Sequence, residues 1–214
     1  GSAQAILDLP YSKLLKIPGI GQKTIDNIKS RVITDYAEKE FALAEKKGVK
    51  IISYLDRDYP FRLKQIPDAP ILIYTKGQFP IDRKQPTIAV VGTRNATNYG
   101  KKLTEEMVEK LSPLKPIILS GLAYGIDIHA HRAALKNHLS TYAVMGSGMD
   151  VIYPSAHQST ATEMQKTGGI ITEQAFGTKP DAFNFPARNR IIAGMADLVI
   201  VVEAAKKGGA LITA

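Results

Sequence analysis

Short apolar runs that alternate with helical segments between residues 87 and 202 constrain the fold of this chain more than any other feature. Strands and helices that alternate at this spacing predict a doubly wound, mostly parallel α/β sheet. The last run, residues 198–202, is rich in valine and has no polar alternation, which predicts a central strand buried on both faces. The predicted parallel strands are residues 87–91, 117–119, 142–145, 170–172 and 198–202.

The first 47 residues have a different, helical pattern and are expected to form a small accessory domain. A helix, the glycine turn Pro18-Gly19-Ile20-Gly21 and a second helix are followed by a longer helix that ends near Gly48. This order resembles a helix-hairpin-helix or SAM-like element, in which amide groups at the glycines and a lysine such as Lys23 contact a DNA phosphate. The alternative is a hairpin that only packs helices or forms a protein interface. The predicted domains are residues 1–47 and residues 48–214, the second truncated at its C-terminal end.

Composition narrows the possible partners. Of the 214 residues, 44% are hydrophobic, so a packed core is expected, and the net charge of +8 favours a polyanionic partner, nucleic acid before membrane. The chain has no cysteine, which excludes a disulfide framework and thiolate catalysis. No apolar run approaches the roughly 18 residues of a membrane helix, and no signal-peptide pattern opens the chain, so a cytoplasmic location is expected.

Glycines at the ends of the predicted strands indicate a ligand site at one edge of the sheet. Parallel sheets bind ligands at the carboxyl ends of their strands, and glycine allows a ligand to approach the backbone closely. Arg94 adds a cation to the first of these loops. The strand-end glycines are Gly92, Gly121, Gly146 and Gly208.

A second group of candidate residues opens the helix before the last strand. Arg188, Asn189 and Arg190 are expected in the first turns of this helix, where free N–H groups and the helix dipole attract anions. With two guanidinium groups, this start would form a phosphate-binding corner. Phe183 and Phe185 border the corner and could stack on bases.

The motifs of catalysis are weak by comparison. Asp127, His129 and His131 form a D-x-H-x-H pattern, but residues two apart on a helix point to different sides. The preferred interpretation is a hydrogen-bonded Asp127–His131 pair that fixes the helix start. No nucleophile-elbow, P-loop or G-x-G-x-x-G motif is found. We therefore expect no catalytic residues, no metal and no cofactor.

Several long motifs occur in one order along the chain: VGTRNATNYG, SGLAYGIDIHAHRAAL, GSGMD followed by Tyr-Pro, FPARNRIIAG, VVEA and GGALITA. Together they resemble the DNA-processing protein DprA (Smf) family over roughly residues 51–214. The resemblance implies a Rossmann-like domain that binds single-stranded DNA without chemistry. It also implies a homodimer and the loading of RecA recombinase onto DNA during natural transformation.

The resemblance also implies which residues contact the DNA. Arg94, Arg188 and Arg190 would hold phosphates, while Gly92, Thr93, Ser120 and Gly121 would offer backbone or hydroxyl contacts. Phe185 and Asn189 lie in the same motif. Many members of the family carry a lysine after the Tyr-Pro motif. In this chain the matching stretch contains Gln158, which lacks the positive charge of that lysine.

Two other classes of function stay open from the sequence. The same type of sheet occurs in nucleotide phosphoribohydrolases of the LOG type, although their PGGxGTxxE motif is not found here. Turnover of AMP-like substrates would identify such an enzyme. A protein-interaction scaffold would have no affinity for DNA at physiological salt.

Overall fold

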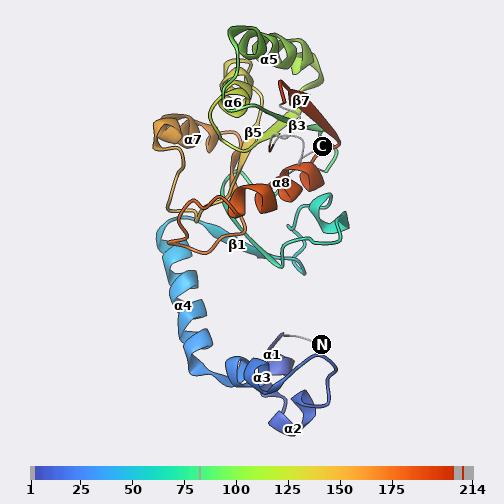
Figure 1. Ribbon diagram of the computed structural model, residues 1–214, viewed down its shortest axis with the longest axis vertical. Coiled ribbons are helices and arrows are strands. Elements are labelled where there is room, and N and C mark those ends of the chain that lie inside the picture. The colour runs from blue at the N-terminus through green and yellow to red at the C-terminus, as the bar shows by residue number, and fades with distance from the viewer. Residues whose placement is uncertain (1–2, 82, 205–208, 210–214) are drawn as a thin grey trace. The chain divides into compact units, whose positions relative to one another are not determined.

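The structure is a computed structural model that describes residues 3–81, 83–204 and 209. The chain divides into two compact units, Gly1–Lys47 and Gly48–Ala214, and each is described by itself (Figure 1).

The first unit is helical. Gly19 has a φ of +83° in the turn between its second and third helices, a conformation that glycine adopts without a steric penalty. Leu14 and Ile25, on either side of this turn, are fully buried and form its apolar centre. The proposal that the hairpin contacts DNA stays a prediction. The helices are α1 (Ala3–Asp8), α2 (Tyr11–Leu14), α3 (Gln22–Lys29) and α4 (Arg31–Lys46).

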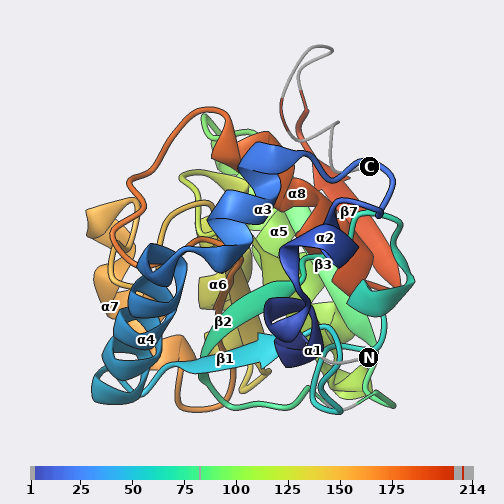
Figure 2. The same cartoon turned by 90° about the horizontal axis from the view of Figure 1, so that it is seen from below.

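The second unit contains one seven-stranded sheet with the order β1-β2-β6-β5-β4-β3-β7. Five strands from β6 to β7 pair in parallel, whereas β1 and β2 add an antiparallel edge, drawn in cyan and teal in Figure 2. The prediction of a doubly wound, mostly parallel sheet is confirmed. The strands are β1 (Lys50–Ser53), β2 (Leu72–Gly77), β3 (Thr87–Gly92), β4 (Ile117–Ser120), β5 (Thr141–Met145), β6 (Gly169–Thr172) and β7 (Leu198–Val202).

Helices cover both faces of this sheet. In Figure 1, α5, α6 and α7 lie on one side of the parallel strands and α8 lies on the other. None of the helices in the described part of the chain is long and apolar enough to cross a lipid bilayer. The helices are α5 (Asn98–Leu111), α6 (Ile126–Lys136), α7 (Gln158–Met164) and α8 (Asn184–Met195), with short 3-10 turns η1 (Leu63–Gln65), η2 (Ser112–Leu114) and η3 (Ser155–His157).

The side chains of residues 88–91 in β3 show why this part of the strand is apolar. Ile88 and Val90 join the core cluster under α5 and α6, while Ala89 and Val91 join the cluster under α8. Successive strand residues point to opposite faces, and a central strand covered on both faces therefore buries all of them.

The expectation for the last strand was partly wrong. In the described residues, β7 pairs with β3 alone and forms an edge of the sheet, and Leu198 is 54% exposed. Val202 is buried at the other end of the strand. The apolar run predicted the strand correctly, but an apolar sequence does not by itself distinguish a central strand from an edge strand.

The order of the strands creates a reversal at β3. From β3 the chain proceeds through β4, β5 and β6, and α8 then crosses the opposite face so that β7 joins the free side of β3. Such a topological switch point leaves a crevice outside the carboxyl ends of the strands, where sheets of this class bind ligands.

Candidate nucleic-acid interface

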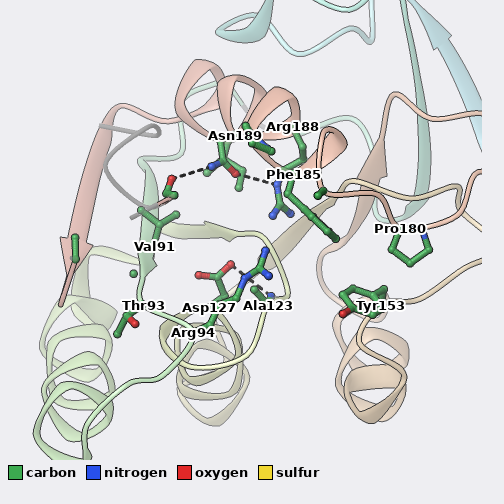
Figure 3. A pocket seen from close by; sticks show the side chains of 16 residues that line it. Val91, Thr93, Arg94, Ala123, Asp127, Tyr153, Pro180, Phe185, Arg188 and Asn189 are labelled. Atoms are coloured by element: carbon green, nitrogen blue, oxygen red, sulfur yellow. Dashed lines mark hydrogen bonds between the residues drawn. The ribbon is translucent and has the colours of Figure 1, made fainter. Parts of the chain in front are cut away.

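A pocket of about 590 Å³ occupies this switch point. Its walls come from the loop after β3, the segment that leads into α6, the loop before α8 and α8 itself (Figure 3). We call it the switch-point pocket. Its lining residues are Val91, Gly92, Thr93, Arg94, Ala123, Asp127, Tyr153, Pro180, Ala182, Phe185, Pro186, Arg188, Asn189, Ile192, Ala204 and Gly209.

One exposed cation and two aromatic rings form the open side of the pocket. Arg94 follows β3 and is exposed, and its guanidinium carbon lies 5.1 Å from the centre of the Phe185 ring. The Phe185 ring in turn lies 5.8 Å from the Tyr153 ring, at an interplanar angle of 33°. A guanidinium beside aromatic faces can hold a phosphate while the rings accept a base.

Arg188 forms the buried floor of the pocket. It points from the second turn of α8 toward the sheet, and the residue is only 5% exposed (Figure 3). Nη1 donates to the carbonyl oxygens of Gly121, at 2.8 Å, and of Val144, and Nε donates to Asn189 Oδ1 at 3.1 Å. Arg188 therefore connects α8 to the carboxyl ends of β4 and β5.

Gly121 is required for this arrangement. A Cβ atom added at residue 121 would lie 2.5 Å from the Arg188 guanidinium nitrogens, closer than real contacts allow. The glycine after β4 thus makes room for a protein guanidinium rather than for a ligand.

Asp127 is a buried acidic residue in the electrostatic field of this cation. Its carboxylate accepts the N–H groups of Gly121, at 3.1 Å, and Ala123, at 3.4 Å. Burial raises the pKa of Asp127, and the nearby Arg188 charge and the two amides oppose that rise. Burial likewise lowers the pKa of Arg188 to about 10, opposed by Asp127, so the guanidinium stays charged at neutral pH.

The loops around the pocket are fixed to each other by backbone contacts. Gly125 has a φ of +77°, and a Cβ atom there would lie 2.1 Å from the carbonyl oxygen of Thr93. The same oxygen accepts the N–H of Ile126 at 3.2 Å, while the N–H of Thr93 donates to the carbonyl of Glu203 at 3.0 Å. The loop that carries Arg94 is therefore held from both sides.

The structure brings together most of the residues predicted from the sequence. Six of them line the switch-point pocket: Gly92, Thr93, Arg94, Phe185, Arg188 and Asn189. Gly121 lines a smaller cavity that adjoins it. The expected contact roles differ, however, because Thr93 and Gly121 already donate their N–H groups to Glu203 and Asp127. Gly208 lies outside the described residues.

Three further predicted residues line neither the switch-point pocket nor the cavity that adjoins it. Ser120 is fully buried, and its hydroxyl donates to the carbonyl of Val90 at 2.6 Å. Arg190 lies in ion pairs with Glu173, at 2.6 Å, and Asp68, at 3.1 Å. Gln158 is exposed at the start of α7, beyond the residues that line the pocket.

The separation of the two arginines follows from helix geometry. Residues two apart on a helix point about 200° apart. Arg188 therefore faces the sheet while Arg190 faces the acidic side chains of Asp68 and Glu173. The predicted corner of paired arginines at a helix start does not form.

The D-x-H-x-H pattern also differs from its prediction. Asp127 accepts two backbone amides, whereas Nδ1 of the buried His131 lies 2.7 Å from Thr141 Oγ1. Burial lowers the pKa of His131 to about 3, so it is neutral at physiological pH. His129 instead contacts Glu105 at 2.7 Å. Among the described residues, no group of three or more His, Cys, Asp or Glu side chains could hold a metal ion.

The sequence did not predict that Asp127 would line the pocket, nor that the loop before α8 would form one of its walls. Pro180 and Ala182 line the pocket from this loop. A signal for Asp127 existed, since an acidic residue in the first turn of a helix after a strand-end glycine commonly accepts backbone N–H groups. Pro180 and Ala182 carry no comparable pattern.

Comparisons with known proteins agree with this geometry. Residues 50–214 match the family described as DNA recombination-mediator protein A. The DNA processing protein DprA of Bacillus subtilis is 35% identical over 210 residues, which cover 95% of this chain and 71% of the relative. DprA of Streptococcus pneumoniae is 44% identical over 161 residues, which cover 75% of this chain and 56% of the relative. Protein Smf of Synechocystis is 37% identical over 202 residues, which cover 93% of this chain and 51% of the relative. The chain thus spans half to about seven-tenths of the length of these relatives.

Solved structures show the same relationship. The crystal structure of Streptococcus pneumoniae DprA superposes with a TM-score of 0.76 at 37% identity, covering 99% of this chain and 77% of that one. DprA of Helicobacter pylori, whose structure is described by its single-stranded DNA binding mode, gives a TM-score of 0.67 at 28% identity, with coverages of 77% and 74%. By sequence and by fold, the chain belongs to the DNA recombination-mediator protein A family, whose members are also named DprA and Smf.

Proposed function

We propose that this chain binds single-stranded DNA without reading its sequence, through the switch-point pocket. The exposed Arg94 guanidinium beside the Phe185 ring is the observation that carries the proposal. A phosphate can pair with the guanidinium while a base stacks on the neighbouring rings, and every base has such a face. The single-stranded DNA binding described for the Helicobacter pylori relative supports the same ligand.

In this proposal, Arg188 and Asn189 shape the site rather than hold the phosphates. The Arg188 guanidinium is committed to the carbonyls of Gly121 and Val144, and Asn189 holds both Arg188 and the carbonyl of Gly209, the latter at 3.2 Å. These contacts fix α8 against the strand ends and so fix the position of Phe185. A positively charged floor also favours a polyanion over a neutral ligand.

We also propose that the site binds its ligand without transforming it. Asp127 is the acidic side chain among the described residues that line the pocket, and two backbone amides and a nearby buried guanidinium already surround it. A general base needs a carboxylate within hydrogen-bond reach of a substrate proton. Asp127 instead organises the loop before α6.

For the whole protein, we extend the proposal to loading RecA recombinase onto single strands in the cytoplasm during natural transformation, as a homodimer. The family membership supports this extension. Sedimentation of the full-length protein tests the dimer, and the rate of RecA filament formation on single strands tests the loading.

The Arg94→Gln variant tests the binding site itself. We expect weaker binding of a fluorescent oligodeoxythymidylate, and a smaller slope of log K against log salt, by about 0.7 for one lost phosphate contact. Arg57→Gln is the matched control, since Arg57 is also an exposed arginine of the sheet unit but does not line the pocket. Unchanged affinity and slope for Arg94→Gln would refute the assignment.

A further inference from the structure

A second groove lies on the outer side of the loop that leads into α6. Its volume is about 670 Å³, and its walls come from the loop after β3 and from α5, α6 and η3. We call it the outer groove. The residues that matter for its chemistry are Arg94, Lys101, Tyr124, His129, Arg132 and His157.

The outer groove is basic. Lys101 is half-buried on α5 and Arg132 is exposed on α6, where its Nε lies 3.5 Å from Thr160 Oγ1. Among the described residues that line the groove, none is acidic. Glu105 approaches from α5, but its carboxylate contacts His129 Nδ1 at 2.7 Å. The two cations therefore face the groove without a carboxylate of the lining to neutralise them.

The outer groove is continuous with the switch-point pocket. Arg94 lines both, and it also lines the small cavity between them, which is bordered by Tyr124 and Phe185. A ligand held by Arg94 at the switch point thus has a path past Tyr124 toward Lys101 and Arg132.

Tyr124 offers a fixed aromatic ring at this passage. It is 50% exposed, and its ring packs at 70° against the ring of His157, with centres 4.9 Å apart. His157 is itself buried, with Nδ1 2.7 Å from the carbonyl oxygen of Leu122. A ring that is exposed on one side and supported on the other is a suitable platform for a base.

The arrangement favours a chain-like ligand over a small one. Arg94, Lys101 and Arg132 come from a loop and two helices around the outer groove, and Arg94 also lines the switch-point pocket, so one ligand can contact these cations only if it extends from one site into the other. A polymer that carries one charge per unit gains from each of these cations through counterion release.

We propose that the outer groove binds the continuation of the single strand whose first segment occupies the switch-point pocket. In this proposal Lys101 and Arg132 each hold a backbone phosphate, and a base stacks on Tyr124 at the passage. The proposal rests on the proposed function and deepens it by giving the strand a direction over the surface and by making affinity depend on strand length.

The test compares the chain, the Lys101→Gln/Arg132→Gln variant and a matched control across a ladder of labelled oligodeoxythymidylates of roughly four to twenty nucleotides. The control is Lys102→Gln/Lys136→Gln, which removes the same charge from α5 and α6. Lys102 lies 3.6 Å from Glu106, and neither control lysine lines the groove. Equal urea midpoints for all three proteins would show that folding is preserved.

We expect the shortest oligonucleotides to bind all three proteins alike. With the longer strands, the outer-groove variant should lose affinity, and its salt slope should be smaller by about 1.4 for two lost phosphates. Tyr124→Leu should weaken the binding of the longer strands without changing the slope of log K against log salt, because it removes no charge. The proposal would be overturned if the outer-groove variant lost the same affinity at every strand length, if the control variant lost as much affinity, or if the outer-groove variant bound long strands normally.

Arg94→Gln separates this proposal from the function on which it rests. If Arg94→Gln weakens the binding of even the shortest strands while the outer-groove variant binds long strands normally, only the role of the outer groove is refuted. If Arg94→Gln changes nothing at any length, the proposed binding site itself is refuted.

Discussion

The buried Arg188 guanidinium and the nearby buried carboxylate of Asp127 carry opposite charges, and they give a stability prediction that can be worked from their burial and hydrogen bonds. Arg188→Met removes the donor to the carbonyls of Gly121 and Val144 and leaves Asp127 buried without its cation. Removing one of two opposite buried charges leaves the other uncompensated, which costs about 3–5 kcal/mol in a directly contacting pair and sets the upper bound here. We expect a loss of unfolding free energy of about 2–5 kcal/mol at pH 7, from the lost hydrogen bonds and the uncompensated carboxylate together, measured by urea denaturation.

The double variant should recover part of this loss. In Asp127→Asn/Arg188→Met both charges are gone, and the amide oxygen of the new asparagine can still accept the N–H groups of Gly121 and Ala123. The loss in the double variant should therefore be smaller than the sum of the two single losses by about 1–3 kcal/mol.

The pH dependence gives a second measurement on the same pair. The pKa of Asp127 is raised above its ordinary value of 3.8, so the folded state binds its proton more tightly than the unfolded state does. The contribution of Asp127 to the free energy of unfolding consequently falls as the pH rises from 3.8 through the raised pKa. Without Arg188 the pKa should rise further, and the loss in Arg188→Met should be smaller at pH 5 than at pH 7. The reasoning would be refuted if the stability losses of the two single variants added up in the double variant, or if the loss in Arg188→Met did not change with pH.

Three further changes test other parts of the fold. Gly92→Ala would place a Cβ atom 2.0 Å from the carbonyl oxygen of Val202, so we expect a loss of about 1–3 kcal/mol or more in urea unfolding. Thr97→Ala removes the side-chain cap of α5 and should cost about 1 kcal/mol, whereas Thr97→Ser should restore it. The pKa of Asp197 is lowered, because hydrogen bonds from Arg62 and a backbone amide outweigh its partial burial. Asp197→Asn should therefore cost at most about 1 kcal/mol at pH 7, and the difference should vanish as the pH falls through the lowered pKa.

The sequence predicted the sheet well because four of its parallel strands, β3, β4, β5 and β6, are buried on both faces. Residues 87–91 become β3, whose alternate side chains enter the two opposite core clusters. That burial makes the whole run apolar, and the run is then visible in the sequence. The edge position of β7 was not predictable, because strand order depends on the direction in which α8 crosses the sheet.

The sequence predicted the edge of the sheet at which the switch-point pocket lies, but not the contacts of the residues around it. Among the residues behind that prediction, Gly92 and Arg94 line the pocket. The roles of Arg188, Arg190 and Ser120 could not be assigned, because they depend on tertiary partners: backbone carbonyls for Arg188, two carboxylates for Arg190 and a β3 carbonyl for Ser120. An arginine in a sequence motif does not reveal whether it meets solvent or the protein interior.

The central claim is that the carboxyl edge of the sheet binds a single strand through Arg94 and neighbouring rings. Fluorescence anisotropy with labelled single-stranded and duplex oligonucleotides of several sequences, across a salt series, tests it most directly. We expect tighter binding of the single strands, no dependence on their sequence, and log K that falls linearly with log salt. Equal binding of duplex and single strand, or an affinity that salt leaves unchanged, would contradict the claim.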